Sequence, residues 1–161
     1  MRPAGAVAFI PPTKGIKGIV GRIIARRQGV PFSHCCVALG NGRCVDSTVP
    51  WTRLTDESYW DRPGVEWHRP STPLSIEQAR ILRSIAYFIE GRIAYSIRNL
   101  FAFLIRGVPG ERSHKLFCTY LVAELYMTLC NDDLSGCGQP WNIDIRELLS
   151  AVRRGQFVRE P

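Results

Sequence analysis

Cys118 is the residue with the clearest potential for chemistry, because of its place in the segment KLFCTYLVAELY (residues 115–126). The residues after the cysteine are mostly apolar, and Glu124 is the charged exception. This pattern predicts a central, buried helix with the cysteine at its N-terminus. A helix N-terminus favours negative charge, and the thiolate is the nucleophilic form of cysteine. Cys118 is therefore either a small buried hydrophobe or a nucleophile that the helix activates.

A nucleophilic cysteine needs a base and a third group that orients the base. The sequence has three histidines. His68 lies among polar residues that we interpret as a loop, and His114 precedes Cys118 by four positions in a predicted turn. His34 opens a predicted strand, and the geometry of the following hairpin favours it as the base.

The hairpin is predicted from HCCVAL (34–39) and RCVDST (43–48), which flank a Gly-Asn-Gly turn signal. With a two-residue loop, His34 and Asp46 would face opposite sides of the sheet. With a three-residue loop, Gly40 to Gly42, they share a face as diagonal neighbours at about 7–8 Å between backbones. We expect that longer loop, with Gly42 in the left-handed region. An acidic side chain inside a strand then has a role, which is to orient the histidine.

The segments SHCCVALGNGRCVDS and FCTYLVAELY together resemble the circularly permuted branch of the NlpC-type, papain-like cysteine hydrolases. The YiiX-like and lecithin-retinol acyltransferase-like proteins belong to that branch. Members carry a histidine at the start of a strand, a polar residue twelve positions later and a cysteine late in the chain. His34, Asp46 and Cys118 occupy those places, and Tyr95 in GRIAYSI resembles the tyrosine that lines the family's substrate cleft.

The resemblance implies a single α+β domain over residues 1–161, with a permuted papain-like fold. A small antiparallel sheet would pack on the buried central helix that bears the cysteine. The implied enzyme is a peptidase or amidase with a Cys118-His34-Asp46 triad, Tyr95 in the substrate site, an acyl-enzyme intermediate and neither metal nor cofactor. The implied substrate is an amide of a cell-wall (peptidoglycan) peptide, and a lipid acyl group is the second candidate for hydrolysis or transfer.

The elements that must position these residues follow from periodicity and cap signals. Ser75 and Gln78 form a capping box before one amphipathic helix, and Asp144 and Glu147 form another. We predict strands at 6–10, 34–39, 43–48 and 65–69, helices at 15–29, 75–90, 96–105, 118–129 and 144–152, and a loop at 48–64.

The composition sets limits on the partners. The 161 residues carry a formal net charge of +7, which attracts polyanions such as an anionic cell envelope or membrane surface. The basic residues are dispersed rather than gathered in a nucleic-acid-binding arm. The alternative to an enzyme is a non-catalytic basic module that binds nucleic acid or an anionic membrane surface. The oligomeric state stays open.

The six cysteines include no C-x-x-C pair, which argues against a zinc site. Unpaired cysteines favour a reducing compartment, so we expect a cytoplasmic rather than an exported protein. The N-terminal MRPAGAVAFIPP has no clear cleavage site and is interpreted as a strand, not a signal peptide. No apolar run reaches the roughly eighteen residues that a transmembrane segment needs.

Overall fold

The computed structural model describes residues 1–15, 18–94, 118–132, 134 and 143–160. Its centre is a six-stranded sheet in the order β4-β3-β2-β1-β5-β6, in which every neighbouring pair is antiparallel. The strands are β1 (Val7–Ile10), β2 (His34–Ala38), β3 (Arg43–Ser47), β4 (Thr52–Asp56), β5 (Glu66–Pro70) and β6 (Phe157–Arg159). The antiparallel α+β architecture expected from the sequence is confirmed.

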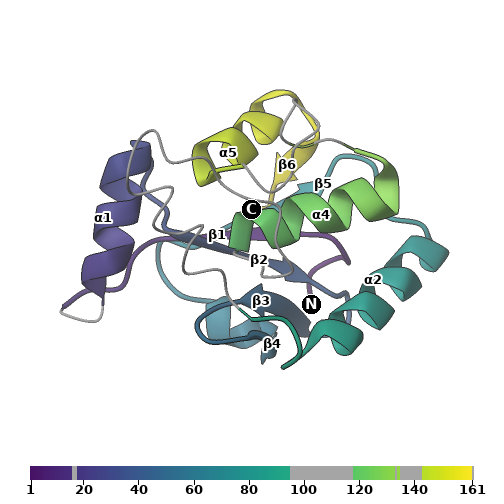
Figure 1. The fold of residues 1–161 in the computed structure, drawn as a ribbon. Helices are drawn as coiled ribbons and strands as arrows, with labels where there is room; N and C mark the ends of the chain where they lie inside the picture. Colours follow the sequence, from purple (N-terminus) through teal and green to yellow (C-terminus); the bar gives the residue numbers. More distant parts are fainter. Residues whose placement is uncertain (16–17, 95–117, 133, 135–142, 161) are drawn as a thin grey trace.

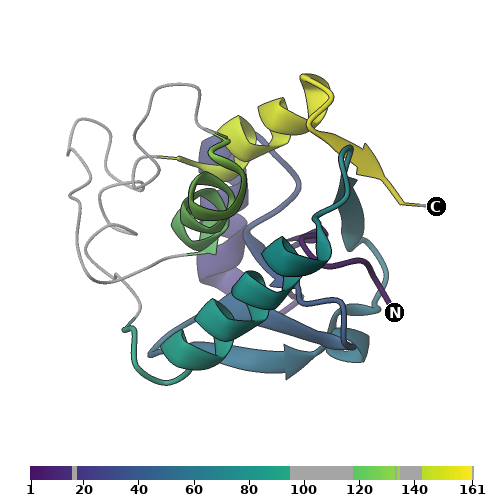
Figure 2. The ribbon, with the colours of Figure 1, turned by 90° about the vertical axis from the view of Figure 1, so that its right-hand side faces the viewer.

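Four α-helices are described around this sheet: α1 (Ile19–Gln28), α2 (Ile76–Ile89), α4 (Cys118–Cys130) and α5 (Ile145–Arg153). A short 3-10 helix, η2 (Glu57–Trp60), follows β4. Helix α4 packs on β2 and β3, and α2 packs against α4 and β4, as Figures 1 and 2 show. Helix α1 stands at the left edge of Figure 1, and α2 stands at the right edge.

Strand β2 separates two apolar clusters because its side chains alternate between the two faces of the sheet. Cys35 and Val37 belong to the larger cluster, with Cys118, Leu121 and other residues of α4. Cys36 and Ala38 belong to a smaller cluster with Trp60 and Trp67. The predicted central helix is confirmed, since the first two turns of α4 are almost wholly buried.

The cap signals in the sequence produce the predicted helix starts. The Ser75 hydroxyl accepts a hydrogen bond from the Gln78 backbone N–H, and the Gln78 side chain accepts one from the Ser75 N–H. Asp144 and Glu147 form the same reciprocal box at the start of α5. Both helices therefore begin where these side chains satisfy backbone donors that have no partner within the helix.

The prediction of a loop over residues 48–64 was wrong. That stretch contains β4, which pairs with β3 along its whole length, and η2. Its prolines and charged residues concealed a short alternation in which Thr52 and Leu54 are buried while Arg53 is exposed. The last strand, β6, was not predicted at all. The predicted helix at 96–105 and residue Tyr95 lie outside the described residues.

Within the described residues, no helix combines the length and the apolar character that crossing a bilayer requires.

Candidate active site

The β2–β3 hairpin has the three-residue loop that the sequence predicted. Val37 pairs with Val45, and the Leu39 N–H donates to the Arg43 carbonyl at 2.8 Å, which leaves residues 40–42 in the turn. Gly42 has a φ of +80°, and a Cβ added there would meet nothing within 4 Å. The glycine is therefore required by its backbone conformation, not by lack of space.

This register places His34 and Asp46 on one face of the sheet, where they contact each other. His34 Nε2 lies 2.5 Å from Asp46 Oδ1. Asp46 has no exposed surface, whereas the His34 side chain is 18% exposed. The expected contact between these two side chains is confirmed. It gives the buried carboxylate of Asp46 a hydrogen-bonding partner, which a buried charged group requires.

The other oxygen of Asp46 faces β4. Arg53 is the cross-strand partner of Asp46, and its Nε donates to Asp46 Oδ2 at 3.3 Å. Asp46 is therefore held from both sides, by the imidazole and by a guanidinium. Sequence reasoning missed Arg53 because β4 was interpreted as loop, although the alternation in TRLT gave a signal for it.

Trp60 covers the exposed side of this pair. Its ring centre lies 5.8 Å from that of His34, with the planes tilted by 42°. The indole Nε1 donates to Thr55 Oγ1 at 2.9 Å, which fixes the ring. An aromatic ring here limits the access of water to the His34–Asp46 hydrogen bond, and so strengthens it.

Cys118 is the first residue of α4 and is 6% exposed. A hydrogen bond from the Cys35 side chain, the charge of His34 and a hydrogen bond with the His34 ring hold its pKa well below the usual value, although burial opposes them. The backbone N–H of Cys35 adds to the same effect. Three residues, Cys118, Cys35 and His34, therefore meet at the N-terminus of α4.

The pKa of the His34 imidazole shifts upward, opposite to that of the Cys118 thiol. Burial disfavours the charge on His34, but the negative charges of Asp46 and the Cys118 thiolate outweigh it and raise the pKa of His34 to about 10. A low thiol pKa beside a high imidazole pKa describes a thiolate–imidazolium pair at neutral pH. Cys35 was not identified from the sequence, since its side chain points away from the face shared by His34 and Asp46.

The remaining histidines do not join this cluster. His68 lies in β5, where a strand was predicted at 65–69, and it is 4% exposed, so its description as a polar loop residue was wrong. Burial lowers the pKa of His68, and its Nε2 lies 3.5 Å from a Glu66 carboxylate oxygen. His114 is outside the described residues, as is Tyr95, so their predicted roles stay predictions.

A cavity of about 220 Å³ borders His34. Pro11, Pro12, Tyr59 and Trp60 give it an apolar wall, and Ser33 and Arg62 also line it. Of the three residues of the candidate site, His34 lines this cavity, and Asp46 and Cys118 do not.

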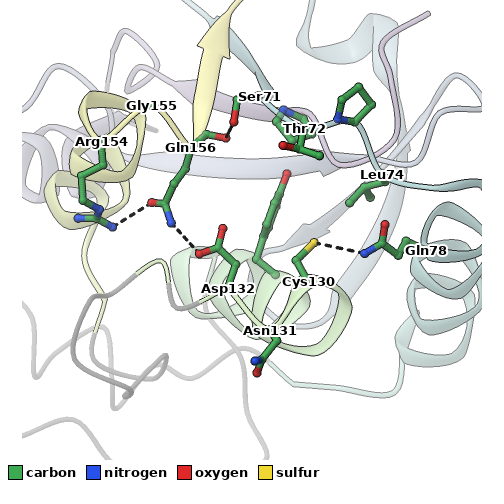
Figure 3. Close-up of a pocket in the computed structure, with 13 residues that line it drawn as sticks. Ser71, Thr72, Leu74, Gln78, Cys130, Asn131, Asp132, Arg154, Gly155 and Gln156 are labelled. Carbon is green, nitrogen blue, oxygen red and sulfur yellow. Dashed lines mark hydrogen bonds between the residues drawn. The ribbon is translucent and has the colours of Figure 1, made fainter.

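A second cavity, of about 540 Å³, lies beyond the far end of α4 and is not lined by His34, Asp46 or Cys118 (Figure 3). Several of its polar side chains are already hydrogen-bonded to one another. Gln156 Nε2 donates to Asp132 Oδ1 at 2.6 Å, and Arg154 donates to the Gln156 side-chain oxygen at 3.1 Å. Although this cavity is larger, the cavity that borders His34 is the better candidate for a substrate site.

Among solved structures, the chain is similar to the crystal structure of the metalloprotein YiiX from Escherichia coli O157:H7. The TM-score is 0.69 at 14% sequence identity, over 99% of this chain and 96% of that one. The chain thus has a YiiX-like fold. No family model matches the sequence, and no curated protein matches it either.

YiiX is described as a metalloprotein, which raises the question of a metal site in this chain. In the parts of the chain that the structure describes, no group of three or more His, Cys, Asp or Glu side chains is placed to hold a metal ion. The described residues therefore do not fit a metal centre.

Proposed function

We propose that this protein is a cysteine-dependent hydrolase that acts through an acyl-enzyme, with Cys118 as nucleophile, His34 as base and acid, and Asp46 as the orienting group. The observation that carries the proposal is the contact between His34 and Asp46 at 2.5 Å beside a thiol of lowered pKa. A permuted papain-like domain, with its catalytic cysteine at the start of a central helix, is part of the same proposal.

The proposed reaction begins from the ion pair. With Nε2 bonded to Asp46, Nδ1 is the ring nitrogen left for the thiol. The Cys118 thiolate attacks the carbonyl carbon, and the imidazolium of His34 then protonates the leaving group. Asp46 holds the ring in one orientation and stabilises its positive charge. Water, deprotonated by the now neutral imidazole, attacks the acyl-enzyme and regenerates the thiolate.

The start of α4 also provides a place for the negative charge that develops on the carbonyl oxygen. Backbone N–H groups at a helix N-terminus have no partner within the helix, and the helix dipole favours an anion there. We assign the oxyanion to the backbone N–H of Cys118, with Tyr95 as a proposed second donor. Every step uses this chain's own groups and water.

The amide of a cell-wall peptide is the proposed substrate, on the family resemblance of the His34, Asp46 and Cys118 segments. A lipid acyl group is the second candidate. It is favoured by the apolar wall of the cavity beside His34, which Pro11, Pro12 and Tyr59 form. An apolar wall suits an acyl chain as well as it suits the stem of a peptide side chain.

The decisive experiment labels the native protein briefly with iodoacetamide near neutral pH and counts adducts by intact mass. Cys118→Ala and Cys130→Ala are matched variants, because the two residues begin and end the same helix. Burial raises the pKa of Cys130, so its thiol is protonated at neutral pH. We expect one rapid addition to wild type and to Cys130→Ala, and none to Cys118→Ala.

Two further variants connect labelling to mechanism. His34→Ala is expected to slow the labelling of Cys118, because it removes the positive charge that stabilises the thiolate. If all thiols react equally slowly and His34→Ala changes nothing, Cys118 is a core residue. The non-catalytic basic module then becomes the better explanation of the +7 charge.

A further inference from the structure

The outward face of α1 carries large apolar side chains although it is exposed. Gly21 and Ala25 turn toward the rest of the protein, and the opposite face carries Ile19, Val20 and Ile23, which are 44%, 54% and 52% exposed. Three large aliphatic side chains within five residues form a contiguous patch on one side of a helix. Scattered exposed apolar residues are common, but a continuous patch indicates an interaction surface.

Positive charge surrounds this patch. Helix α1 carries Arg22, Arg26 and Arg27, all exposed, and no acidic residue. Exposed Lys14 lies just before the helix. An amphipathic helix with an apolar stripe between cationic side chains is typical of the plane between lipid headgroups and acyl chains.

Helix α2 provides a comparison within the same molecule. It also exposes large apolar residues, with Ile81 at 39% and Phe88 at 66%. Its charges are of mixed sign, since Glu77 pairs with Arg80 at 2.6 Å. The uniform positive charge of α1 is therefore what distinguishes the two faces and defines the partner as an anionic surface.

Helix α1 also borders the candidate active site, with its inward side rather than with the patch. Gly18 and Gly21, at the start of α1, line the same cavity of about 220 Å³ that His34 borders. Tyr59, which is 58% exposed, and Arg62 lie on the wall of that cavity. An aromatic residue with one polar tip is common at membrane interfaces.

We propose that α1 docks this protein on an anionic lipid surface, with its three aliphatic side chains among the acyl chains and its arginines at the headgroups. The docking stands independently of the proposed hydrolase, whereas the delivery of an acyl lipid to Cys118 rests on it. A twofold dimer through α1 is disfavoured, because it would bring the arginines of both copies into one interface with no acidic residue of α1 to pair them.

Sedimentation with vesicles tests the proposal. We expect the full chain to bind vesicles of phosphatidylcholine with about one third phosphatidylglycerol, to bind pure phosphatidylcholine weakly, and to dissociate as salt is raised. Arg26→Gln with Arg27→Gln should weaken binding by about fivefold per arginine. Ile19→Ser with Ile23→Ser should weaken it by about tenfold or more.

Matched controls come from α2 and β5. Ile81→Ser with Phe88→Ser removes as many exposed apolar side chains, and Arg69→Gln with Arg80→Gln removes as much charge; both pairs should bind like wild type. Thermal melting monitored by circular dichroism confirms that each variant is folded.

Three results would overturn the proposal: no binding to the anionic vesicles, equal losses in the α1 and control variants, or a change of oligomeric state in the Ile19→Ser, Ile23→Ser variant without a change in vesicle binding. The last would assign the patch to a second copy of the chain. Iodoacetamide labelling of Cys118 without vesicles should be unaffected by the α1 variants. Failure of the docking is therefore distinguishable from failure of the proposed hydrolase.

Discussion

The thiolate–imidazolium pair predicts an unusual dependence of stability on pH. The pKa of His34 is raised from 6.5 to about 10, and that of Cys118 is lowered well below the usual value for a cysteine. A raised histidine pKa alone stabilises the fold fully below 6.5, and this stabilisation is lost as pH rises toward 10. A lowered cysteine pKa stabilises the fold above its unfolded value, and this is lost as pH falls through the folded value.

The pH dependences that His34 and Cys118 give to the stability cancel each other near neutral pH. Between pH 6.5 and about 8.5, the folded pair holds one proton, on the imidazolium of His34. The unfolded chain also holds one proton, on the thiol of Cys118. The free energy of unfolding changes with pH in proportion to the difference in bound protons between the unfolded and folded states. That difference is zero for this pair between pH 6.5 and about 8.5, so the pair does not make stability depend on pH in that range.

Cys118→Ala removes this cancellation. The folded variant still holds a proton on His34, because Asp46 keeps the imidazole charged, while the unfolded chain holds none above pH 6.5. The free energy of unfolding of the variant should then fall by about 1.4 kcal/mol per pH unit relative to wild type. From pH 6.5 to 8 the difference between the two profiles should reach about 2 kcal/mol.

Urea denaturation at half-unit pH intervals measures both profiles, and subtracting one from the other cancels the groups common to both. Those groups include buried His68, which is protonated below pH 6.5 in the unfolded chain. Parallel profiles for wild type and Cys118→Ala would refute the argument that Asp46 keeps His34 charged without the thiolate, because the folded variant would then hold no more protons than its unfolded chain. Adding Asp46→Asn to Cys118→Ala should remove the slope.

Three further predictions test the surroundings of the pair. Cys35→Ala should slow the alkylation of Cys118 at neutral pH by about tenfold or more, because the thiolate loses a hydrogen bond. Cys35→Ser keeps a donor at this position, so it should retain most of the wild-type rate. Arg53→Gln should destabilise the protein by at most about 1 kcal/mol in urea denaturation, since Arg53 is half exposed, and a loss of several kcal/mol would contradict this. Gly42→Ala should cost about 1 kcal/mol through its positive φ alone, whereas Gly42→Asn should cost less, and equal stability of both variants with wild type would contradict the turn geometry.

The sequence predicted the contact between His34 and Asp46 because parity in a hairpin is a strict constraint. A loop of three residues places His34 and Asp46 on one face, and a loop of two does not. The cap signals at Ser75 and Asp144 were equally reliable, because a side chain that satisfies backbone donors acts locally. In each case the predicted contact joins residues that are at most twelve positions apart in the sequence.

The features that were missed depend on contacts between distant parts of the chain. Strand β4 forms because β3 supplies a partner for each of its residues, which outweighs the poor strand propensity of its own composition. The contact between Cys35 and Cys118 joins a strand to a helix more than eighty positions later in the chain. No local pattern contains that contact, so the role of Cys35 became visible only in the folded protein.

The fold also shows where the positive charges lie, which the net charge alone does not. In the sequence, the basic residues are dispersed, and +7 indicates only some polyanion. Folding places Arg22, Arg26 and Arg27 on one outward helix and turns Gly21 and Ala25 of that helix inward, so the aliphatic residues between them have no place in the core. A surface that is both apolar and cationic suits a lipid interface better than nucleic acid, whose backbone offers no apolar partner. The arrangement of the charges, rather than their sum, therefore supports the membrane as the partner.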